Sequence, residues 1–283
     1  MLSYQHGYHA GCFADVVKHL TLTRITNYLI QKDKPAFYLE THSGRGIYDL
    51  KDGQATKNSE FLQGISLLWD QRKQLSPLFA PYMDVIKSLN PSGVLRYYPG
   101  SPYLAMSGLR ATDRLVCAEL HQGEFSHLEK SPIQGRNVYL KHADGMKELN
   151  ALLPPIERRG LIFMDPSWEI KDEYKTIPNA IKQAYSRFAT GTYCLWYPII
   201  DNRLHNQLVT NMKSTEANNA LQIEFYMTSK AQQGMTGCGL WIINPPYLLA
   251  NEMKSILDYL RTIFNKGVSS YLIQQTGTDK RPS

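Results

Sequence analysis

Residues 36–46 of the chain, Ala-Phe-Tyr-Leu-Glu-Thr-His-Ser-Gly-Arg-Gly, join a short apolar and aromatic run to a turn that contains two glycines. A short apolar run that is bounded by turn residues is typical of a strand buried within a sheet. Because glycine has no Cβ, the turn allows the backbone to approach a ligand closely. The stretch therefore predicts a buried strand that leads directly into a glycine-rich, ligand-binding turn.

Six further apolar runs follow along the chain, and helical patterns separate several of them. These runs are residues 115–120, 137–141, 160–164, 192–197, 221–227 and 239–243. Continuous apolar strands that are separated by helices indicate a parallel sheet covered on both faces. The sequence thus predicts an α/β, Rossmann-like fold with about seven strands in a mostly parallel sheet.

The segment between the first two predicted strands has a different pattern. Residues 50–97 contain two stripes of apolar residues at helical spacing, with no convincing strand before the turn at residues 98–102. A length of 283 residues suits one large domain that carries an insertion. We therefore expect a single domain over residues 1–283, with a small helical insertion at residues 50–97.

The overall charge is moderately basic, and tyrosine is the commonest aromatic residue. Lysine and arginine number 31 against 25 acidic residues, which gives a net charge of +6, and there are 18 tyrosines against 9 phenylalanines. Such a composition suits a nucleic-acid partner, although charge is evidence about binding and solubility rather than about fold.

Membrane, secretion and metal-binding classes are disfavoured by simple patterns. The longest nearly apolar run, residues 192–200, is too short to span a bilayer, and residues 1–11 lack the pattern of a signal peptide. The four cysteines are widely scattered and form no CxxC pair, and the histidines near the N-terminus lack a matching acid or cysteine cluster. We therefore expect a monomeric cytoplasmic protein with no metal site.

Acidic residues occupy the positions where several predicted strands end. Glu40, Glu119, Asp144 and Asp165 all lie at or just after such an end. The carboxyl ends of parallel strands meet at one edge of a doubly wound sheet, and ligands bind there. If the ligand is a nucleoside, Glu119 can accept hydrogen bonds from both ribose hydroxyls, and Asp144 can accept one from the exocyclic amine of adenine.

The spacing of these acids distinguishes between two nucleotide cofactors. A dinucleotide-binding fingerprint requires GxGxxG and an acid about 20 residues later. Here the glycine pattern stops at Gly46, and Glu119 lies 79 residues after Glu40. This spacing disfavours NAD and fits S-adenosylmethionine, with the helical insertion lying between the first two strands.

Asp165-Pro166-Ser167-Trp168 follows the fourth predicted strand and is similar to the Asp/Asn-Pro-Pro-aromatic motif of amino-methyltransferases. The exocyclic amine of adenine is a poor nucleophile, because its lone pair is delocalised into the ring. A carboxylate and a backbone carbonyl that accept its two N–H bonds favour a pyramidal nitrogen, and proline helps to aim that carbonyl. An aromatic side chain can stack on an extruded base. The motif predicts Asp165 as the catalytic residue, with Pro166 and Trp168 against the base.

A second segment, Asn244-Pro245-Pro246-Tyr247, matches the motif more closely and also follows an apolar strand. It comes after the seventh predicted strand, far along the sheet from the expected ligand-binding edge. Asp165 lies only 21 residues after Asp144 and so suits that edge. We favour Asp165 and keep Asn244 as the alternative.

Longer blocks of sequence resemble the bacterial 23S rRNA adenine-N6 methyltransferase J family, and they extend over nearly the whole chain. The blocks are Met1-Leu2-Ser3-Tyr4-Gln5-His6, His9-Ala10-Gly11, Ala14-Asp15-Val16, Lys18-His19, and residues 40–44, 97–102, 158–162 and 187–193. That family also has an Asn-Pro-Pro-aromatic segment near its last strand that is not catalytic, which supports Asp165 over Asn244. The resemblance implies a class I, S-adenosylmethionine-dependent enzyme that methylates the N6 amine of an adenosine in 23S rRNA.

The resemblance also implies residue roles, position by position. The positions that match the family's cofactor contacts are His19, His42, Ser101, Glu119, Asp144, Gly145 and Asp165. Asp165 matches the catalytic residue, and Tyr4 matches a residue that meets the substrate adenosine. The chain departs from the family at Ser167, where a second proline is usual, and this puts the rigidity of the loop in question.

Three alternatives remain open at this point. The first alternative keeps the same chemistry: the enzyme methylates adenine in DNA, or it takes part in the use of imported DNA. From another class, the chain is a nucleic-acid-binding module that lost catalysis through the change to Ser167. A small-molecule methyltransferase is the third alternative, and the family resemblance disfavours it.

Overall fold

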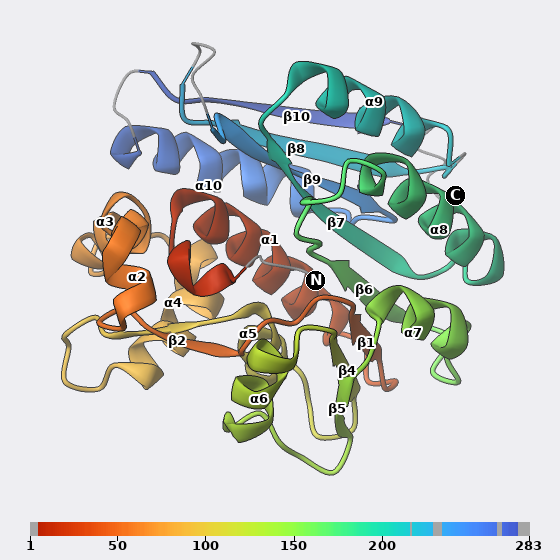
Figure 1. Ribbon diagram of the computed structural model, residues 1–283, viewed down its shortest axis with the longest axis horizontal. Coiled ribbons are helices and arrows are strands. Elements are labelled where there is room, and N and C mark those ends of the chain that lie inside the picture. The colour runs from red at the N-terminus through yellow and green to blue at the C-terminus, as the bar shows by residue number, and fades with distance from the viewer. Residues whose placement is uncertain (1–4, 216, 229–233, 265–267, 277–283) are drawn as a thin grey trace.

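The computed structural model describes residues 5–215, 217–228, 234–264 and 268–276. Within these residues, one sheet of eight strands runs through the molecule (Figure 1). In order across the sheet, the strands are β5 (Val138–His142), β4 (Arg114–Glu119), β1 (Phe37–Glu40), β6 (Gly160–Met164), β7 (Thr192–Ile199), β9 (Gly237–Ile243), β8 (Ala220–Tyr226) and β10 (Ser270–Thr276). The predicted α/β fold is confirmed, but this sheet has eight strands in the described part of the chain, where the sequence predicted about seven.

Strand direction in this sheet decides where the loops lie. The strands β5, β4, β1, β6 and β7 pair in parallel. Strand β9 is antiparallel to both β7 and β8, so β8 runs in the same direction as β7, while β10 is antiparallel to β8. Six of these eight strands thus run one way, and the carboxyl ends of β1, β4 and β6 meet at one edge.

Helices cover both faces of the sheet, and each face has its own hydrophobic cluster. One face is covered by α1 (Phe13–Leu29), α4 (Ala80–Leu89), α5 (Ser101–Gly108), α6 (Gln122–Lys130) and α10 (Leu249–Ile263). The other face is covered by α7 (Gly145–Leu152), α8 (Glu173–Arg187) and α9 (Asn202–Lys213). Helix α1 is buried along nearly its whole length, so the polar residues that it carries must find partners inside the protein.

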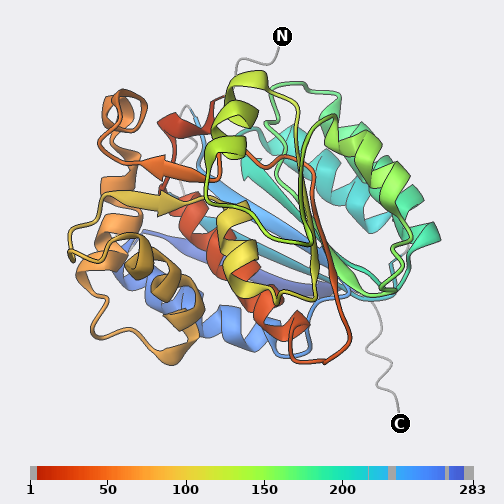
Figure 2. The ribbon, with the colours of Figure 1, turned by 90° about the horizontal axis from the view of Figure 1, so that it is seen from below.

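The chain between β1 and β4 forms a small two-stranded ribbon and several short helices. The ribbon pairs β2 (Ile47–Asp49) with β3 (Tyr97–Pro99) in antiparallel register. Between these strands lie α2 (Gly53–Asn58), α3 (Ile65–Asp70), α4 and the 3-10 turns η2 (Glu60–Gln63) and η3 (Pro77–Phe79). Figure 2 shows these helices at one side of the molecule, next to α1 and α10. The sequence did not predict the ribbon, because strands of three residues are too short to show a pattern.

Candidate active site

Two adjacent cavities lie near the edge where β1, β4 and β6 end. The first cavity has a volume of about 310 Å³, and the second has a volume of about 530 Å³. His6, Lys18, Asp165 and Ser167 line both cavities and so form the boundary between them.

The first cavity brings together most of the residues that the sequence singled out. Its walls include His19, His42, Ser101, Glu119, Asp144, Gly145 and Asp165. Pro166 and Trp168 are buried next to Asp165 and do not form part of either wall. Tyr4 lies outside the described residues.

Glu119 ends β4, and two backbone amides hold its carboxylate. The amide of Gly44 donates to Oε2 at 2.7 Å, and the amide of His121 donates to Oε1 at 2.7 Å. Gly44 adopts a φ of +61°, a conformation that costs glycine little because it has no Cβ. Burial raises the pKa of Glu119, although both amides oppose the shift. Each carboxylate oxygen retains a lone pair that can accept a hydrogen bond from a ligand hydroxyl.

Asp144 and Gly145 form the N-terminus of α7 at the cavity wall. The Oδ1 atom of Asp144 accepts a hydrogen bond from the amide of Met146 at 3.0 Å and thereby caps the helix. A Cβ on Gly145 would lie 1.9 Å from the carbonyl oxygen of Thr41. Only glycine therefore allows α7 to begin so close to the turn that follows β1.

Ser101 reaches the first cavity from the start of α5, and its hydroxyl is hydrogen-bonded to the buried carboxyl of Glu40. The hydroxyl of Tyr38 donates to the other carboxyl oxygen of Glu40 at 2.9 Å. Burial raises the pKa of Glu40 to about 8, even though both hydrogen bonds oppose the shift. Glu40 is therefore mostly protonated at neutral pH, and this part of the wall is uncharged.

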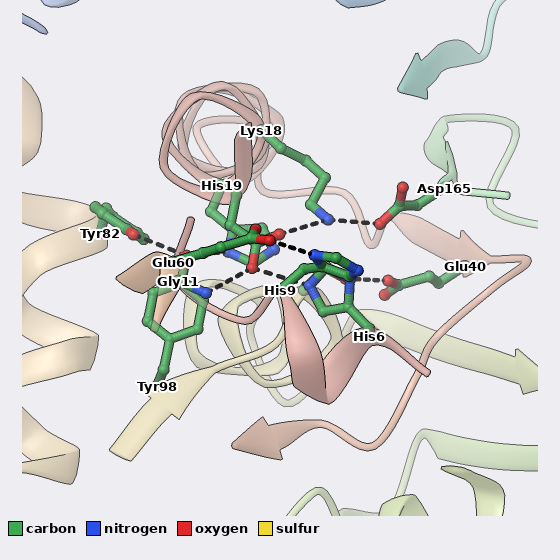
Figure 3. A network of polar contacts seen from close by, with 12 residues as sticks. His6, His9, Gly11, Lys18, His19, Glu40, Glu60, Tyr82, Tyr98 and Asp165 are labelled. Carbon is green, nitrogen blue, oxygen red and sulfur yellow. Dashed lines mark hydrogen bonds and ion pairs between the residues drawn. The ribbon is translucent and has the colours of Figure 1, made fainter. Parts of the chain in front are cut away.

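Lys18 lies between two carboxylates at the boundary of the cavities (Figure 3). Its Nζ atom is 2.6 Å from Oδ2 of Asp165 and 2.8 Å from Oδ1 of Asp15. The other oxygen of Asp15 accepts a hydrogen bond from the amide of Gly11 at 2.8 Å and lies 2.9 Å from Nε2 of His6. The network thus joins the 3-10 turn η1 (His6–Tyr8), helix α1 and the loop after β6.

Mutual attraction sets the charge states in this network. Burial opposes the ionisation of Asp15, but the neighbouring His6 and Lys18 lower its pKa well below the usual range. Burial likewise opposes the charge on Lys18, but Asp15 and Asp165 raise its pKa well above the usual range. Lys18 and Asp15 are therefore ionised at neutral pH, which satisfies the requirement that buried charges be paired.

Two histidines on the first cavity are neutral. Burial lowers the pKa of His19 to about 3 and that of His42 to about 4. The Nδ1 atom of His19 lies 2.8 Å from the hydroxyl of Tyr98, and the Nδ1 atom of His42 lies 2.8 Å from the hydroxyl of Thr41. At neutral pH each ring therefore has one nitrogen that donates and one that accepts.

Trp168 packs into the hydrophobic cluster on the α7–α9 face instead of facing a cavity. Only 7% of the residue is exposed, and its ring centroid is 4.7 Å from that of Tyr174. Its Nε1 atom donates to the carbonyl oxygen of Trp196 at 3.2 Å. In this conformation the ring of Trp168 anchors the loop, and it is not placed to stack on a base in either cavity.

Asn244 lies at the opposite edge of the sheet from Asp165. Because β9 runs antiparallel to β7, its last residue, Ile243, pairs with Tyr193 near the start of β7. Tyr193 in turn pairs with Ile162 in the middle of β6, and Thr192, which donates to the carbonyl of Asn244, pairs with Leu161 near the start of β6, whereas Asp165 follows its end. Strand direction therefore separates the two motif segments and removes Asn244 from the cavities.

Sequence reasoning did not assign a site role to Asp15, Lys18 or His6. A usable signal was present, because Asp15 and Lys18 are two opposite charges three residues apart in an otherwise apolar helical segment. Charges on the buried side of a helix require partners, and here the partners lie at the site.

Across the described residues, no group of three or more acidic, histidine or cysteine side chains is arranged to hold a metal ion. None of the described helices is both long and apolar enough to span a membrane.

The strand order, and the acids that follow successive strands around a nucleoside-sized cavity, define a Rossmann-like class I methyltransferase fold. The family model described as "Ribosomal RNA large subunit methyltransferase D, RlmJ" matches residues 33–274. The chain belongs to this family.

Individual relatives match along nearly their whole length. A protein of Haemophilus influenzae named "Ribosomal RNA large subunit methyltransferase J" is 42% identical over 277 residues, which cover 97% of this chain and 98% of that protein. A protein of the same name from Escherichia coli is 40% identical over 263 residues, with 93% and 94% covered. The crystal structure of protein LPL1258 from Legionella pneumophila superimposes on this structure with a TM-score of 0.91 at 52% sequence identity. The match covers 96% of this chain and 99% of that protein's chain.

Proposed function

We propose that this chain is an S-adenosylmethionine-dependent methyltransferase that modifies the exocyclic N6 amine of an adenosine in 23S large-subunit ribosomal RNA. Its family membership and the names of its relatives support a methyltransferase of large-subunit ribosomal RNA. The observation that carries the chemistry is that Asp165 lies on the boundary between two cavities. A residue there can contact a cofactor on one side and a base on the other.

The first cavity suits S-adenosylmethionine. Its volume of about 310 Å³ lies within the usual range for small-molecule sites. In this proposal Glu119 accepts hydrogen bonds from the ribose hydroxyls, Asp144 accepts one from the adenine amine, and Gly145 lets the backbone come close; all three residues line the cavity. His19, His42 and Ser101 provide neutral polar groups for the rest of the molecule. When bound, S-adenosylmethionine supplies a methyl group on a positively charged sulfur, which is already activated toward nucleophiles.

The second cavity suits the target adenosine, and Asp165 is the group that would hold its amine. Within the described residues, Oδ2 of Asp165 is paired with Lys18 and Oδ1 has no hydrogen-bond partner. The Oδ1 atom can therefore accept one N–H of the amine. We propose that the carbonyl of Pro166, which lines neither cavity in this conformation, turns to accept the other when the base binds. The nitrogen then keeps its lone pair free for the methyl group. Positioning supplies most of the rate, since a strong base is not needed before transfer.

Lys18 and Trp168 serve this arrangement indirectly. The ion pair with Lys18 fixes one oxygen of Asp165 and leaves the other available to a ligand at the boundary of the two cavities. Trp168 anchors the far end of the loop in the core through Trp196. Tyr4, from outside the described residues, is proposed to contact the substrate adenosine.

The basic excess of the chain is proposed to lie on a surface that meets RNA phosphates, since the cavities themselves carry several acids. The affinity for RNA should then fall as the salt concentration rises. We also propose that residues 50–97 act as an insertion within one domain over residues 1–283. The protein is proposed to act as a monomer in the cytoplasm, without a metal ion.

Methyl transfer from labelled S-adenosylmethionine tests the proposal. Unmodified 23S rRNA and duplex DNA are offered separately to the wild-type protein and to Asp165→Ala, and the products are digested to nucleosides. We expect labelled N6-methyladenosine from rRNA with the wild-type protein, and almost none with the variant. Label that appears only in DNA would overturn the RNA assignment, and equal labelling by both proteins would overturn the role of Asp165.

A further inference from the structure

A chain of three buried polar side chains connects the helices of residues 50–97 to the first cavity. Tyr82 on α4, Tyr98 on β3 and His19 on α1 are each at most 1% exposed. The hydroxyls of Tyr82 and Tyr98 are 2.9 Å apart, and the hydroxyl of Tyr98 is 2.8 Å from Nδ1 of His19. All three are labelled in Figure 3, where His19 lies next to Lys18 and the two tyrosines lie on the side away from Asp165.

The direction of hydrogen bonding along this chain follows from counting protons. Burial raises the pKa of both phenols well above the usual value, so each hydroxyl keeps its single proton. Among the described residues, the hydroxyl of Tyr82 has Tyr98 as its one hydrogen-bond partner. If Tyr82 accepted from Tyr98, its own proton would be buried without an acceptor, which costs the desolvation of that group. Tyr82 therefore donates to Tyr98, and Tyr98 donates to His19.

The protonation of His19 then has a single solution. Burial lowers the pKa of its imidazole to about 3, so the ring is neutral and carries one proton. Since Nδ1 accepts from Tyr98, the proton must be on Nε2. No hydrogen-bond partner occurs for Nε2 within the described residues, and the side chain lines the first cavity. His19 thus offers an N–H donor to whatever ligand occupies that cavity.

We propose that Tyr82 and Tyr98 are positioning residues that hold His19 as the Nε2–H tautomer, so that it donates to the carboxylate of bound S-adenosylmethionine. This carboxylate is the one anionic group of the cofactor, and an N–H donor is complementary to it. The inference rests on the proposed function for the identity of the ligand, but the tautomer itself rests on the hydrogen-bond geometry and the burial of these three side chains. It gives α4, in the segment between β1 and β4, an indirect part in cofactor recognition, through Tyr98 and His19.

The first experiment observes the tautomer without any ligand. ¹⁵N NMR of the histidine ring nitrogens distinguishes protonated from unprotonated Nδ1 and Nε2, and His19 is assigned by comparison with His19→Gln. We expect a single Nε2–H form in the wild-type protein and a mixture of both tautomers in Tyr98→Phe. Tyr193→Phe is the matched control, since Tyr193 is a buried tyrosine whose hydroxyl donates to the carbonyl of Phe188. A wild-type ring protonated on Nδ1 would overturn the proposal.

The second experiment measures binding of S-adenosylmethionine and S-adenosylhomocysteine by calorimetry. We expect Tyr98→Phe to raise both Kd values about fivefold to tenfold, because the donor to a charged group is no longer fixed. Tyr82→Phe should have a smaller effect of about twofold to threefold, because it removes only the bias on Tyr98. The affinity for 5′-methylthioadenosine, which lacks the amino-acid end, should not change.

Substitution of His19 itself provides a rescue. The side-chain amide of glutamine places its NH₂ near the position of Nε2, whereas that of asparagine places it near Nδ1. We therefore expect His19→Gln to bind S-adenosylmethionine more tightly than His19→Asn. Equal affinities for these two variants, or a Tyr98→Phe affinity equal to that of Tyr193→Phe, would contradict the proposal. A wild-type protein that binds no S-adenosylmethionine would instead overturn the proposed function and leave the NMR result standing.

Discussion

The Asp165–Trp168 segment and the Asn244–Tyr247 segment carry nearly the same sequence at opposite edges of one sheet. In the second, both N–H groups of the Asn244 side-chain amide donate to backbone carbonyls at 2.8 Å, and the backbone carbonyl of Asn244 accepts from the hydroxyl of Thr192. In the first, Lys18 occupies one oxygen of Asp165, and the other has no partner within the described residues. At Asn244, backbone carbonyls take up the hydrogen bonds of the side-chain N–H groups, and the segment closes a loop. At Asp165, one carboxylate oxygen stays available, and the segment can bind a ligand.

The same contrast applies to Glu224 on β8, a carboxylate that lines neither cavity. Its side chain is hydrogen-bonded to Tyr197, His205, Gln222 and Tyr226. Although burial opposes ionisation, these partners lower the pKa of Glu224 to about 2. Glu224 is therefore a buried charge with a structural role. Its shifted pKa, a property often found in catalytic acids, comes here from protein partners alone.

The largest effect is expected at Asp165. Replacement by alanine removes the acceptor at the boundary, and kcat should fall at least about 100-fold, as it does when a preorganised polar contact is lost. Asp165→Asn keeps the shape and one oxygen, so it should retain more activity than alanine. The measurement is single-turnover methylation of 23S rRNA. An alanine variant within about tenfold of wild type would remove the distinction between the two segments.

Glu224 should affect stability and leave catalysis unchanged. Its pKa is about 2 in the folded protein and roughly 4.3 in the unfolded chain, so it stabilises the fold by ~3 kcal/mol above pH 4.5. This contribution is lost as the pH falls toward 2. Glu224→Gln should therefore be less stable at pH 7, and the difference should shrink at pH 3. Urea denaturation at both pH values measures the effect, and a difference that grows on acidification would contradict it.

Asn244→Ala should lower the free energy of unfolding by ~1–3 kcal/mol, because two hydrogen bonds are lost and the left-handed backbone disfavours alanine. The φ of Asn244 is 52°. Asn244→Gly is the matched control, since glycine accepts this backbone and loses only the side-chain bonds. Both variants should methylate rRNA within about twofold of wild type at 25 °C. A large loss of activity in a variant that remains folded would assign Asn244 a role in catalysis.

The smallest effect is expected at Ser167. This residue occupies the third position of its segment, where the Asn244–Tyr247 segment has Pro246. Ser167→Pro should leave kcat within about threefold and raise stability by at most ~1 kcal/mol, through the reduced entropy of the unfolded chain. Steady-state kinetics and thermal denaturation check both values. A rate gain above tenfold would show that loop rigidity limits the natural protein.

Much of the fold was predictable because buried parallel strands are continuous apolar runs. Strand β10 escaped prediction because it lies at the edge and its residues alternate between exposed and half-buried positions. The choice of Asp165 over Asn244 was also predictable, because it depended only on which predicted strand each segment follows along the chain. The packing of Trp168 did not follow from the motif, because it depends on a φ of 57° that turns the ring toward Trp196. The role of Lys18 depended on two carboxylates that lie three and 147 residues away.

The shared boundary of the two cavities has a thermodynamic consequence. Lys18 and Asp165 belong to both walls, so a ligand that shifts this ion pair from one side changes the free energy of binding on the other. Linkage requires the effect to be reciprocal: the factor by which a nucleotide alters cofactor affinity equals the factor by which the cofactor alters nucleotide affinity. A single buried ion pair thus couples the binding free energies of the two ligands before any methyl group is transferred.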